Sequence, residues 1–231
     1  MRIAVLGGSF NPFHIGHAMA GESVIKELGY DKVIFIPTYI PPHKKITGTG
    51  ASASHRLGML KAFCMEEGRL AEGFSGKDGS DISFLFDSCE IDRGGVSYTW
   101  ETLEYIINKC KGVIEGRPGL IIGEEIAAEF NKWKNPEKIA AMADIIIVPR
   151  IPDYSRKDAG CYTNKPSGDY EGDFSVPFDE NSFGYPYKKL SSPVVSVSST
   201  DIRNRIANGK SYKYLVPSPV FKYIEEHNLY R

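Results

Sequence analysis

Residues 2–17 have the sequence RIAVLGGSFNPFHIGH and introduce a pattern that recurs along the chain. The mostly apolar residues 2–6 predict a short buried strand, and the glycine pair 7–8 predicts a tight loop after it. Over residues 17–28, small and apolar side chains recur at helical spacing, and Gly29 is a typical residue to end the helix. In open α/β sheets, a loop between the carboxyl end of a strand and a helix is where ligands bind.

The same alternation of apolar strands and helices continues beyond this first unit. Further buried strands are predicted at residues 33–36, within 82–91, at 120–122, at 144–148 and at 194–197. Helices are predicted around residues 57–64, 100–110, 124–142, 199–207 and 219–227. Strands that are apolar on both faces and alternate with helices are typical of a parallel sheet covered on both sides. The predicted fold class is therefore α/β, a Rossmann-like doubly wound parallel sheet with C-terminal helices.

Length and composition limit the kinds of partner. The 231 residues predict a single domain, 1–231, and 28 Lys+Arg against 29 Asp+Glu give a net charge of −1, which provides no bulk attraction to nucleic acid or to a membrane. Four cysteines stand singly, which argues against a zinc ribbon or a disulfide scaffold. The longest aliphatic run, residues 145–148, is far shorter than a membrane span. We expect a cytoplasmic protein that binds small molecules, and leave a homo-oligomer open.

Two segments depart from the alternation. Residues 68–81 are polar and rich in glycine, which predicts a surface loop. Residues 151–190 contain prolines, glycines and tyrosines with almost no aliphatic periodicity, which predicts a long inserted loop. The tyrosines argue against simple disorder, because disordered segments are poor in aromatic residues. This insert could be a substrate lid, an oligomer contact or neither.

The loop at residues 7–17 has the chemistry of an anion site. Gly7 and Gly8 allow backbone N–H groups to approach a phosphate, and the helix N-terminus adds further donors. His14 and His17 are three residues apart, so on a helix they share a face and both can point at one anion. The pair could instead bind a metal ion or pack as structural histidines. The loop matches neither the G-x-G-x-x-G fingerprint nor the G-x-x-x-x-G-K-[ST] loop.

The motif G-G-S-F-N-P-F-H-I-G-H at residues 7–17 resembles the HxGH signature of nucleotidyltransferases, and specifically that of the bacterial nicotinate-nucleotide adenylyltransferases. Further matching segments follow in the family's order at 41–44, 97–103, 121–123, Trp133, 198–203 and 215–230. Only 68–81 and 151–190 lie outside the resemblance. Enzymes of this family join nicotinate mononucleotide to ATP, which gives nicotinate adenine dinucleotide (deamido-NAD) and pyrophosphate in NAD biosynthesis.

The resemblance implies roles for individual residues. It implies that His17 is the main stabiliser of the phosphoryl charge, with His14 in support and Arg203 neutralising phosphates. The implied contacts to ATP come from Gly8, Ser9, Phe10, His14, His17, Gly123, Glu125, Ser199 and Arg203. The implied contacts to nicotinate mononucleotide come from Asn11, Lys44, Tyr98, Thr99 and Trp133. The implied cofactor is Mg²⁺, bound with ATP and held largely by its phosphates, with no metal ligand from the protein.

The local sequence is compatible with several of these roles. Residues 198–200 can cap the predicted helix after them, and Arg203 can give phosphate a bidentate contact. On this motif alone an exposed arginine is the simpler interpretation, and the same helix also contains Arg205; only the resemblance selects Arg203. Trp133 lies between two lysines, and the resemblance implies that its face stacks on the pyridine ring. It also implies that backbone N–H groups at 98–99 hold the nicotinate carboxylate.

The sequence departs from the family pattern in two places. The family commonly has Gly-x-Asp after the strand at 121–123, whereas this chain has Glu125, which keeps the charge but is one methylene longer. The segment at 151–190 is also longer than the family leads us to expect.

Three other interpretations are compatible with part of the sequence. A pantetheine-phosphate adenylyltransferase or a cytidylyltransferase shares the first motif but is expected to lack the Ser-Tyr-Thr segment and Trp133. A fragment of a class I aminoacyl-tRNA synthetase also has His-Ile-Gly-His, but no Lys-Met-Ser-Lys-Ser-like loop or anticodon domain fits this chain. A catalytically inactive nucleotide sensor would bind ATP without turnover, and the intact histidine pair argues against it.

Overall fold

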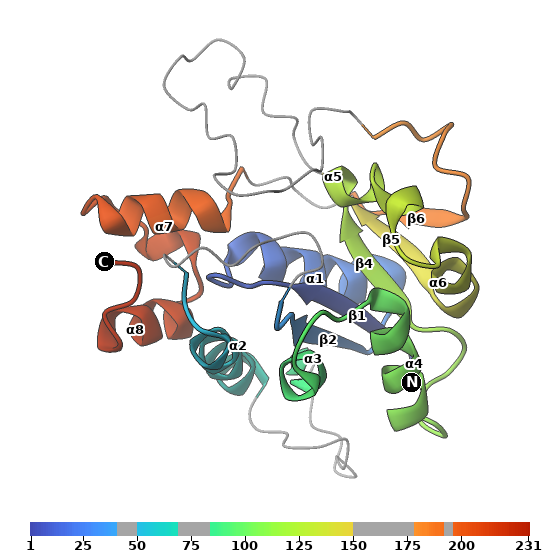
Figure 1. The fold of residues 1–231 in the computed structure, drawn as a ribbon, viewed down its shortest axis with the longest axis horizontal. Helices are drawn as coiled ribbons and strands as arrows, with labels where there is room; N and C mark the ends of the chain where they lie inside the picture. Colours follow the sequence, from blue (N-terminus) through green and yellow to red (C-terminus); the bar gives the residue numbers. More distant parts are fainter. Residues whose placement is uncertain (41–49, 69–83, 150–177, 192–195) are drawn as a thin grey trace.

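The computed structural model describes residues 1–40, 50–68, 84–149, 178–191 and 196–231 (Figure 1). Its centre is a parallel sheet with the strand order β3-β2-β1-β4-β5-β6. The strands are β1 (Ile3–Gly8), β2 (Lys32–Pro37), β3 (Phe84–Phe86), β4 (Gly119–Gly123), β5 (Asp144–Val148) and β6 (Tyr187–Lys189). The predicted α/β class with a parallel sheet is confirmed.

Helices connect the strands and close the chain. The first half contains α1 (Ile15–Leu28), α2 (Ala53–Gly68), α3 (Cys89–Arg93) and α4 (Thr99–Lys109). The second half contains α5 (Glu124–Ala127), the 3-10 turn η1 (Phe130–Lys132), α6 (Pro136–Met142), α7 (Ser199–Ala207), the 3-10 turn η3 (Lys213–Leu215) and α8 (Ser218–Glu226). Figure 1 shows α7 and α8 together beside α2, at the opposite end of the molecule from β6. Within the described ranges, no helix is both long and apolar enough to cross a membrane.

Alternate residues of the strands bury opposite faces of the sheet, as expected from the side-chain period of two. On one face, strand residues pack against α1, α2, α7 and α8: Ala4, Leu6, Val33, Phe35, Ile121 and Ile146. On the other face, strand residues pack against α3, α4, η1 and α6: Ile3, Val5, Ile34, Ile36, Leu120, Ile122, Ile145 and Ile147. This double burial explains why the strand sequences are continuously apolar.

The direction of strand addition reverses at β1. After β1 the chain adds β2 and β3 on one side, and it then returns to place β4 on the other side of β1. Because all paired strands are parallel, the loops that leave the carboxyl ends of β1, β2 and β4 emerge at one edge of the sheet. Such a reversal point is where open α/β sheets form ligand crevices.

The predicted helix at 124–142 is divided into α5, η1 and α6. Asn135 has a positive φ of 59° and is followed by Pro136, which begins α6. A left-handed residue before a proline ends one helical segment and begins another, because proline is favoured in the first turn. The single-helix prediction was wrong for this reason.

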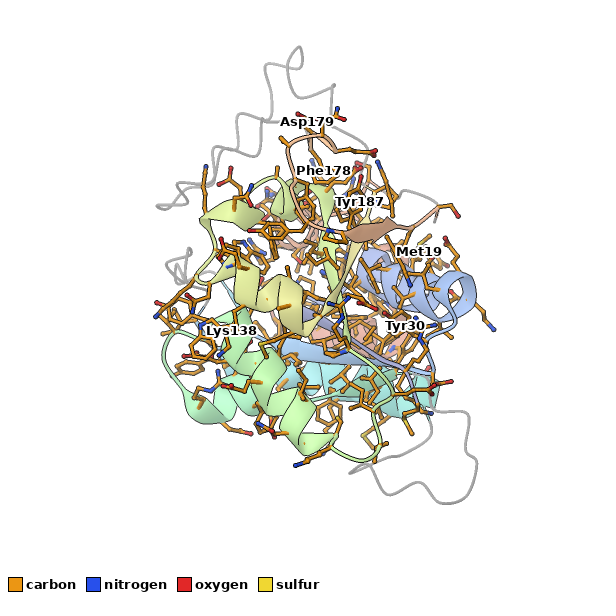
Figure 2. The ribbon with its side chains drawn as sticks, turned by 90° about the vertical axis from the view of Figure 1, so that its right-hand side faces the viewer. Met19, Tyr30, Lys138, Phe178, Asp179 and Tyr187 are labelled. Carbon is orange, nitrogen blue, oxygen red and sulfur yellow. The ribbon has the colours of Figure 1, made fainter. Side chains whose placement is uncertain are left out.

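The last strand also differs from the prediction. The sixth strand is Tyr187–Lys189, inside the segment that we expected to form only a loop, whereas Val197 lies outside any strand and is buried in the core. Figure 2 shows Phe178 and Tyr187 near each other beside this strand, and their rings are 5.7 Å apart. An edge strand pairs on one side only, so it needs no continuous apolar run, and the sequence signal was weak. Residues 192–195 lie outside the described residues.

Other expectations fall partly outside the described ranges. Residues 69–83 and 150–177 are not described, so the predicted surface loop and most of the predicted insert stay predictions. The same holds for Lys44 and Cys161. Cys64, Cys89 and Cys110 are buried free thiols.

Candidate active site

The loop between β1 and α1 is shaped around a buried phenylalanine ring. Phe10 is 1% exposed and has a positive φ of 45°, a backbone conformation that is uncommon for residues other than glycine. A Cβ atom on Gly8 would lie 3.0 Å from this ring, so any larger residue would require the ring to shift. Since the Phe10 ring faces the core, any contact of Phe10 with a ligand would involve its backbone.

His14 and His17 lie side by side at the start of α1. His14 is the N-cap residue and is 7% exposed, and the two imidazole rings stack with centroids 3.7 Å apart. The backbone N–H of His14 donates to Nδ1 of His17 at 3.2 Å. A ring nitrogen that accepts a hydrogen bond has no proton, so the neutral ring of His17 has its proton on Nε2. His17 can therefore donate a hydrogen bond through Nε2.

The glycine of the HxGH motif permits this stacking. A Cβ atom on Gly16 would lie 3.2 Å from the His14 ring and 3.2 Å from the Val197 side chain. The predicted common face of the two histidines is present. Among the described residues, no third His, Cys, Asp or Glu completes a cluster that could hold a metal ion.

Helix α7 faces this loop with its N-terminus. Its N-cap residue Ser198 accepts a hydrogen bond from the Asp201 backbone N–H at 3.1 Å. Ser199 donates its hydroxyl to the Pro12 carbonyl at 2.8 Å. The Ser199 hydroxyl proton is therefore used within the protein, and contact with a phosphate would come from its backbone N–H.

Arg203 on α7 reaches the same loop. Its Nη1 donates to the Asn11 carbonyl at 2.7 Å and its Nη2 to the Thr200 hydroxyl at 3.2 Å. Burial lowers the pKa of the Arg203 guanidinium, which is the expected effect of a low-dielectric environment on a cation. Arg205 instead pairs with Asp201 at 2.8 Å, away from the loop. The geometry thus favours Arg203 over Arg205, as the resemblance did.

Asn11 connects the loop to two distant parts of the chain. Its Oδ1 accepts hydrogen bonds from the Ala51 backbone N–H at 3.0 Å and from the Tyr230 hydroxyl at 2.8 Å. The sequence analysis gave Asn11 as a contact to nicotinate mononucleotide but did not predict its hydrogen bonds to Ala51 and Tyr230. Tyr230 was noted only as part of a C-terminal match, since a contact across 219 positions leaves no local pattern.

Arg56 is a site residue that sequence reasoning missed entirely. It is 2% exposed, and its guanidinium donates to three backbone carbonyls, one of them that of Ser9 in the β1–α1 loop, at 2.8 Å. A signal was present, because Arg56 stands at helical spacing with the buried Met59, Leu60 and Phe63. A cation on the apolar stripe of a helix indicates a buried polar partner.

Tyr98 and Thr99 begin α4 at the same edge of the sheet. Tyr98 is the N-cap residue, and its backbone N–H donates to the Glu101 carboxylate at 3.2 Å. Two residues earlier, Val96 forms a parallel bridge with Ile40, which follows β2. The start of α4 therefore lies beside the loop that leaves β2.

Trp133 precedes Lys134, which contacts the start of α4. The Trp133 ring is half-buried and lies 5.2 Å from the Phe130 ring. The ammonium of Lys134 lies 4.2 Å from the centre of the Tyr98 ring. The structure thus brings the 133–134 turn against the start of α4.

Gly123 and Glu125 follow the neighbouring strand. Gly123 ends β4 and is the N-cap residue of α5, and Glu125 is half-buried in the first turn of that helix. Because β4 pairs with β1, this turn emerges at the same edge as the histidine loop. The predicted site residues that the structure describes thus lie on loops or helix starts at the carboxyl edge of the sheet or facing it. Lys44 lies outside the described residues.

Comparison with known sequences gives one consistent family. The sequence model of the Cytidylyltransferase-like family matches residues 5–205. A nicotinate-nucleotide adenylyltransferase of Borreliella afzelii is 34% identical over 230 residues, which cover 100% of this chain and 97% of that protein. Its counterpart in Treponema pallidum is 33% identical over 231 residues and covers 100% of both chains.

Comparison with solved structures gives the same fold. The nicotinic acid mononucleotide adenylyltransferase of Plasmodium falciparum, complexed with NaAD, has a TM-score of 0.67 at 16% identity, covering 99% of this chain and 97% of that chain. In its complex with APC the TM-score is 0.66. The predicted nucleotidyltransferase fold is confirmed. Because the sequence match to the bacterial relatives extends over their full length, this chain belongs to the nicotinate-nucleotide adenylyltransferases of the Cytidylyltransferase-like family.

Proposed function

We propose that the protein transfers the adenylyl group of ATP to nicotinate mononucleotide, giving nicotinate adenine dinucleotide and pyrophosphate in NAD biosynthesis. The observation that supports this most strongly is the stacked histidine pair at the reversal point of the sheet, with Arg203 against the same loop. The full-length identity of 33–34% to relatives of that name supports the choice of substrate.

The reaction needs positioning and charge stabilisation rather than an enzyme nucleophile. A phosphate oxygen of nicotinate mononucleotide attacks the α-phosphorus of ATP, and the bond to the β-phosphate oxygen breaks as pyrophosphate leaves. Negative charge develops on the oxygens around the α-phosphorus. His17 meets this charge with its Nε2 proton, His14 supports the orientation of His17, and Arg203 supplies a fixed positive charge.

The two substrates occupy neighbouring parts of the carboxyl edge. We place ATP against backbone groups of Gly8, Ser9, Phe10, Gly123 and Ser199, with Glu125 toward the adenosine. We place the pyridine ring between Trp133 and the start of α4, with its carboxylate at residues 98–99. The backbone N–H of Thr99 is the donor we propose there, because that of Tyr98 donates to Glu101. Asn11 lies near the junction of the two substrates. Lys44 is proposed for the acceptor phosphate on sequence grounds alone.

Mg²⁺ is proposed to enter with ATP. Nucleotidyltransferases generally use a divalent metal with ATP, which shields the phosphate charge and assists the departure of pyrophosphate. We propose that the metal is held largely by phosphate and water oxygens, because a triphosphate supplies the oxygen ligands that Mg²⁺ prefers. We also propose a cytoplasmic location, since the free thiols of Cys64, Cys89 and Cys110 are typical of a reducing compartment.

The test is release of pyrophosphate by the purified protein with Mg²⁺–ATP and one of three acceptors: nicotinate mononucleotide, nicotinamide mononucleotide or phosphopantetheine. We expect turnover with nicotinate mononucleotide, and a loss of at least about 100-fold in kcat for His17→Ala. Turnover with another acceptor alone would retain the chemistry but refute the substrate. ATP binding without turnover on any acceptor would refute the enzyme.

A further inference from the structure

Arg56 on α2 is a buried cation whose partners are backbone carbonyls. Its guanidinium donates to the carbonyls of Ser9 at 2.8 Å, Thr38 at 2.6 Å and Tyr39 at 3.1 Å. It is 2% exposed, and within the described residues it forms no ion pair with a carboxylate. Burial of a charge is expensive unless hydrogen bonds compensate it, and the three carbonyls provide such bonds.

These contacts join two loops at the carboxyl edge of the sheet. Ser9 lies in the loop after β1, whereas Thr38 and Tyr39 follow β2 directly. The two strands are paired up to Gly8 and Pro37, and the Thr38 backbone N–H then donates to the Gly8 carbonyl at 2.9 Å. Beyond that bond, the guanidinium of Arg56 contacts both loops. Its planar fork of donors can contact several carbonyls at once, which an ammonium on a single carbon cannot do with the same geometry.

The second loop leads toward the acceptor side of the site. Ile40, the residue after Tyr39, forms the parallel bridge with Val96 beside the start of α4. Arg56 therefore connects the loop proposed for the ATP phosphates to a chain segment that contacts the proposed acceptor region. A rigid connection between the two substrate regions is what an in-line displacement requires.

We propose that Arg56 is a positioning residue that fixes the loop after β1 relative to the loop after β2, and thereby aligns the acceptor phosphate with the α-phosphorus of ATP. This inference rests on the proposed function for the identity of the two ligands. Arg56 is buried, and the hydrogen bonds that it donates within the described residues go to carbonyls of the two loops, so its replacement leaves in place the groups that we propose to bind each ligand. Loss of Arg56 should therefore destabilise the transition state, in which the two substrates must be aligned, more than it weakens the binding of either substrate.

The experiment compares wild type, Arg56→Lys and Arg56→Met by steady-state release of pyrophosphate. We expect kcat to fall about 100-fold in Arg56→Met, because a misplacement of about 1 Å has that cost, while both KM values stay within about threefold. Arg56→Lys retains the charge and at least one carbonyl contact, so its kcat should be intermediate. Arg205→Met is the control, since Arg205 pairs with Asp201 and donates to the Ser211 carbonyl, and it should keep wild-type kinetics.

A second measurement tests whether Arg56 connects the two loops and does not depend on catalysis. Backbone hydrogen exchange of peptides that cover residues 7–11 and 36–40 should accelerate together in Arg56→Met, while a peptide that covers the turn after β4 should be unchanged. If Arg56→Met does not fold, Arg56→Lys decides the question by the same two readouts. An increase in KM with unchanged kcat, or exchange that rises in one loop only, would overturn the proposal. A wrong acceptor would show instead in the wild-type enzyme, so the two failures are distinguishable.

Discussion

Lys134 places a positive charge at the proposed nicotinate site. Its ammonium lies 4.2 Å from the centre of the Tyr98 ring, next to Trp133 and above the start of α4. Nicotinate mononucleotide has a carboxylate where nicotinamide mononucleotide has a neutral amide. Replacing Lys134 by Met should therefore lower kcat/KM for the nicotinate substrate about tenfold, which corresponds to about 1.4 kcal/mol, and change the nicotinamide value little.

Lys138→Met is the control for Lys134→Met. Its ammonium lies 3.9 Å from the centre of the Trp100 ring, so it makes the same type of contact with a different aromatic residue. The control should leave the ratio of the two kcat/KM values unchanged. An equal loss for both acceptors in Lys134→Met would contradict a selective role and indicate general damage to the site.

Glu90 gives a stability prediction with a definite pH dependence. Burial raises the pKa of this carboxyl above its ordinary value of 4.5, against the lowering effects of the Thr102 hydroxyl and Arg93. The unfolded chain therefore releases this proton at a lower pH than the folded chain does. As the pH rises through 4.5 and then through the folded pKa, the carboxyl makes an increasing unfavourable contribution to folding.

Glu90→Gln should consequently stabilise the protein at neutral pH. The gain in the free energy of unfolding should be near zero below pH 4.5 and reach roughly 1.4 kcal/mol for each unit by which the folded pKa is raised. Urea denaturation at several pH values measures it, with Glu226→Gln on the exposed side of α8 as control. A gain that does not depend on pH would show that charge is not the cause.

The residues that the sequence could predict are those whose chemistry lies in a local pattern. The paired histidines follow from the spacing of His14 and His17 on one helix, and their stacking is observed. The partners of Arg56 and Tyr230 could not be predicted, because they lie 47 and 219 positions away at Ser9 and Asn11. Pairwise contacts at such separations depend on the finished fold, which a linear pattern does not encode.

At the scale of elements, Gly58 fixes the contact between α2 and α8. A Cβ atom at this position would lie 2.6 Å from Cζ of Tyr223 and closer still to its hydroxyl. In an exposed helix, replacing glycine by alanine gains about 1 kcal/mol. Here the overlap should outweigh that gain, so Gly58→Ala should lower the free energy of unfolding by about 1–2 kcal/mol, measured by chemical denaturation.

A double-mutant cycle separates the two effects. Tyr223→Ala opens the space opposite Gly58, so in that background the alanine at 58 should cost less or even stabilise. Additive effects of the two substitutions would mean that the overlap is not the cause of the loss.

The bounds of helices and strands were predicted best where the sequence has clear start and stop residues at both ends of the element. Helix α7 has its predicted bounds, because Ser198 caps it and the apolar stripe of Ile202 and Ile206 is regular. Strand β6 was not predicted, because an edge strand of tyrosine and lysines has no apolar run. The division between η1 and α6 depends on the left-handed backbone of Asn135, which the sequence indicates only through the proline that follows.

At the scale of the whole molecule, the hydroxyl of Tyr230 joins the C-terminal region to the site. It donates to Asn11 at 2.8 Å, and Asn11 in turn accepts a hydrogen bond from Arg203 on its carbonyl. Tyr230→Phe removes one partly buried hydrogen bond and should lower the free energy of unfolding by about 1 kcal/mol. It should also lower kcat several-fold, because Asn11 loses one of the contacts that orient it.

The same measurements on Tyr214→Phe provide the comparison, since Tyr214 is 81% exposed, and Asn11 is hydrogen-bonded to Ala51, Tyr230 and Arg203 instead. Both of its values should equal those of the wild type. If Tyr230→Phe kept full activity while losing stability, the Tyr230 contact would serve the fold and not the reaction.

The strand order has a consequence for synthesis on the ribosome. In the order β3-β2-β1-β4-β5-β6, each strand, as it emerges, pairs at an open edge of the strands made before it, first on one side of β1 and then on the other. None of the six described strands has to insert between two that are already paired. The sheet can therefore grow outward in the order of translation, and a nascent chain that ends after β3 already has its central strand paired along one side.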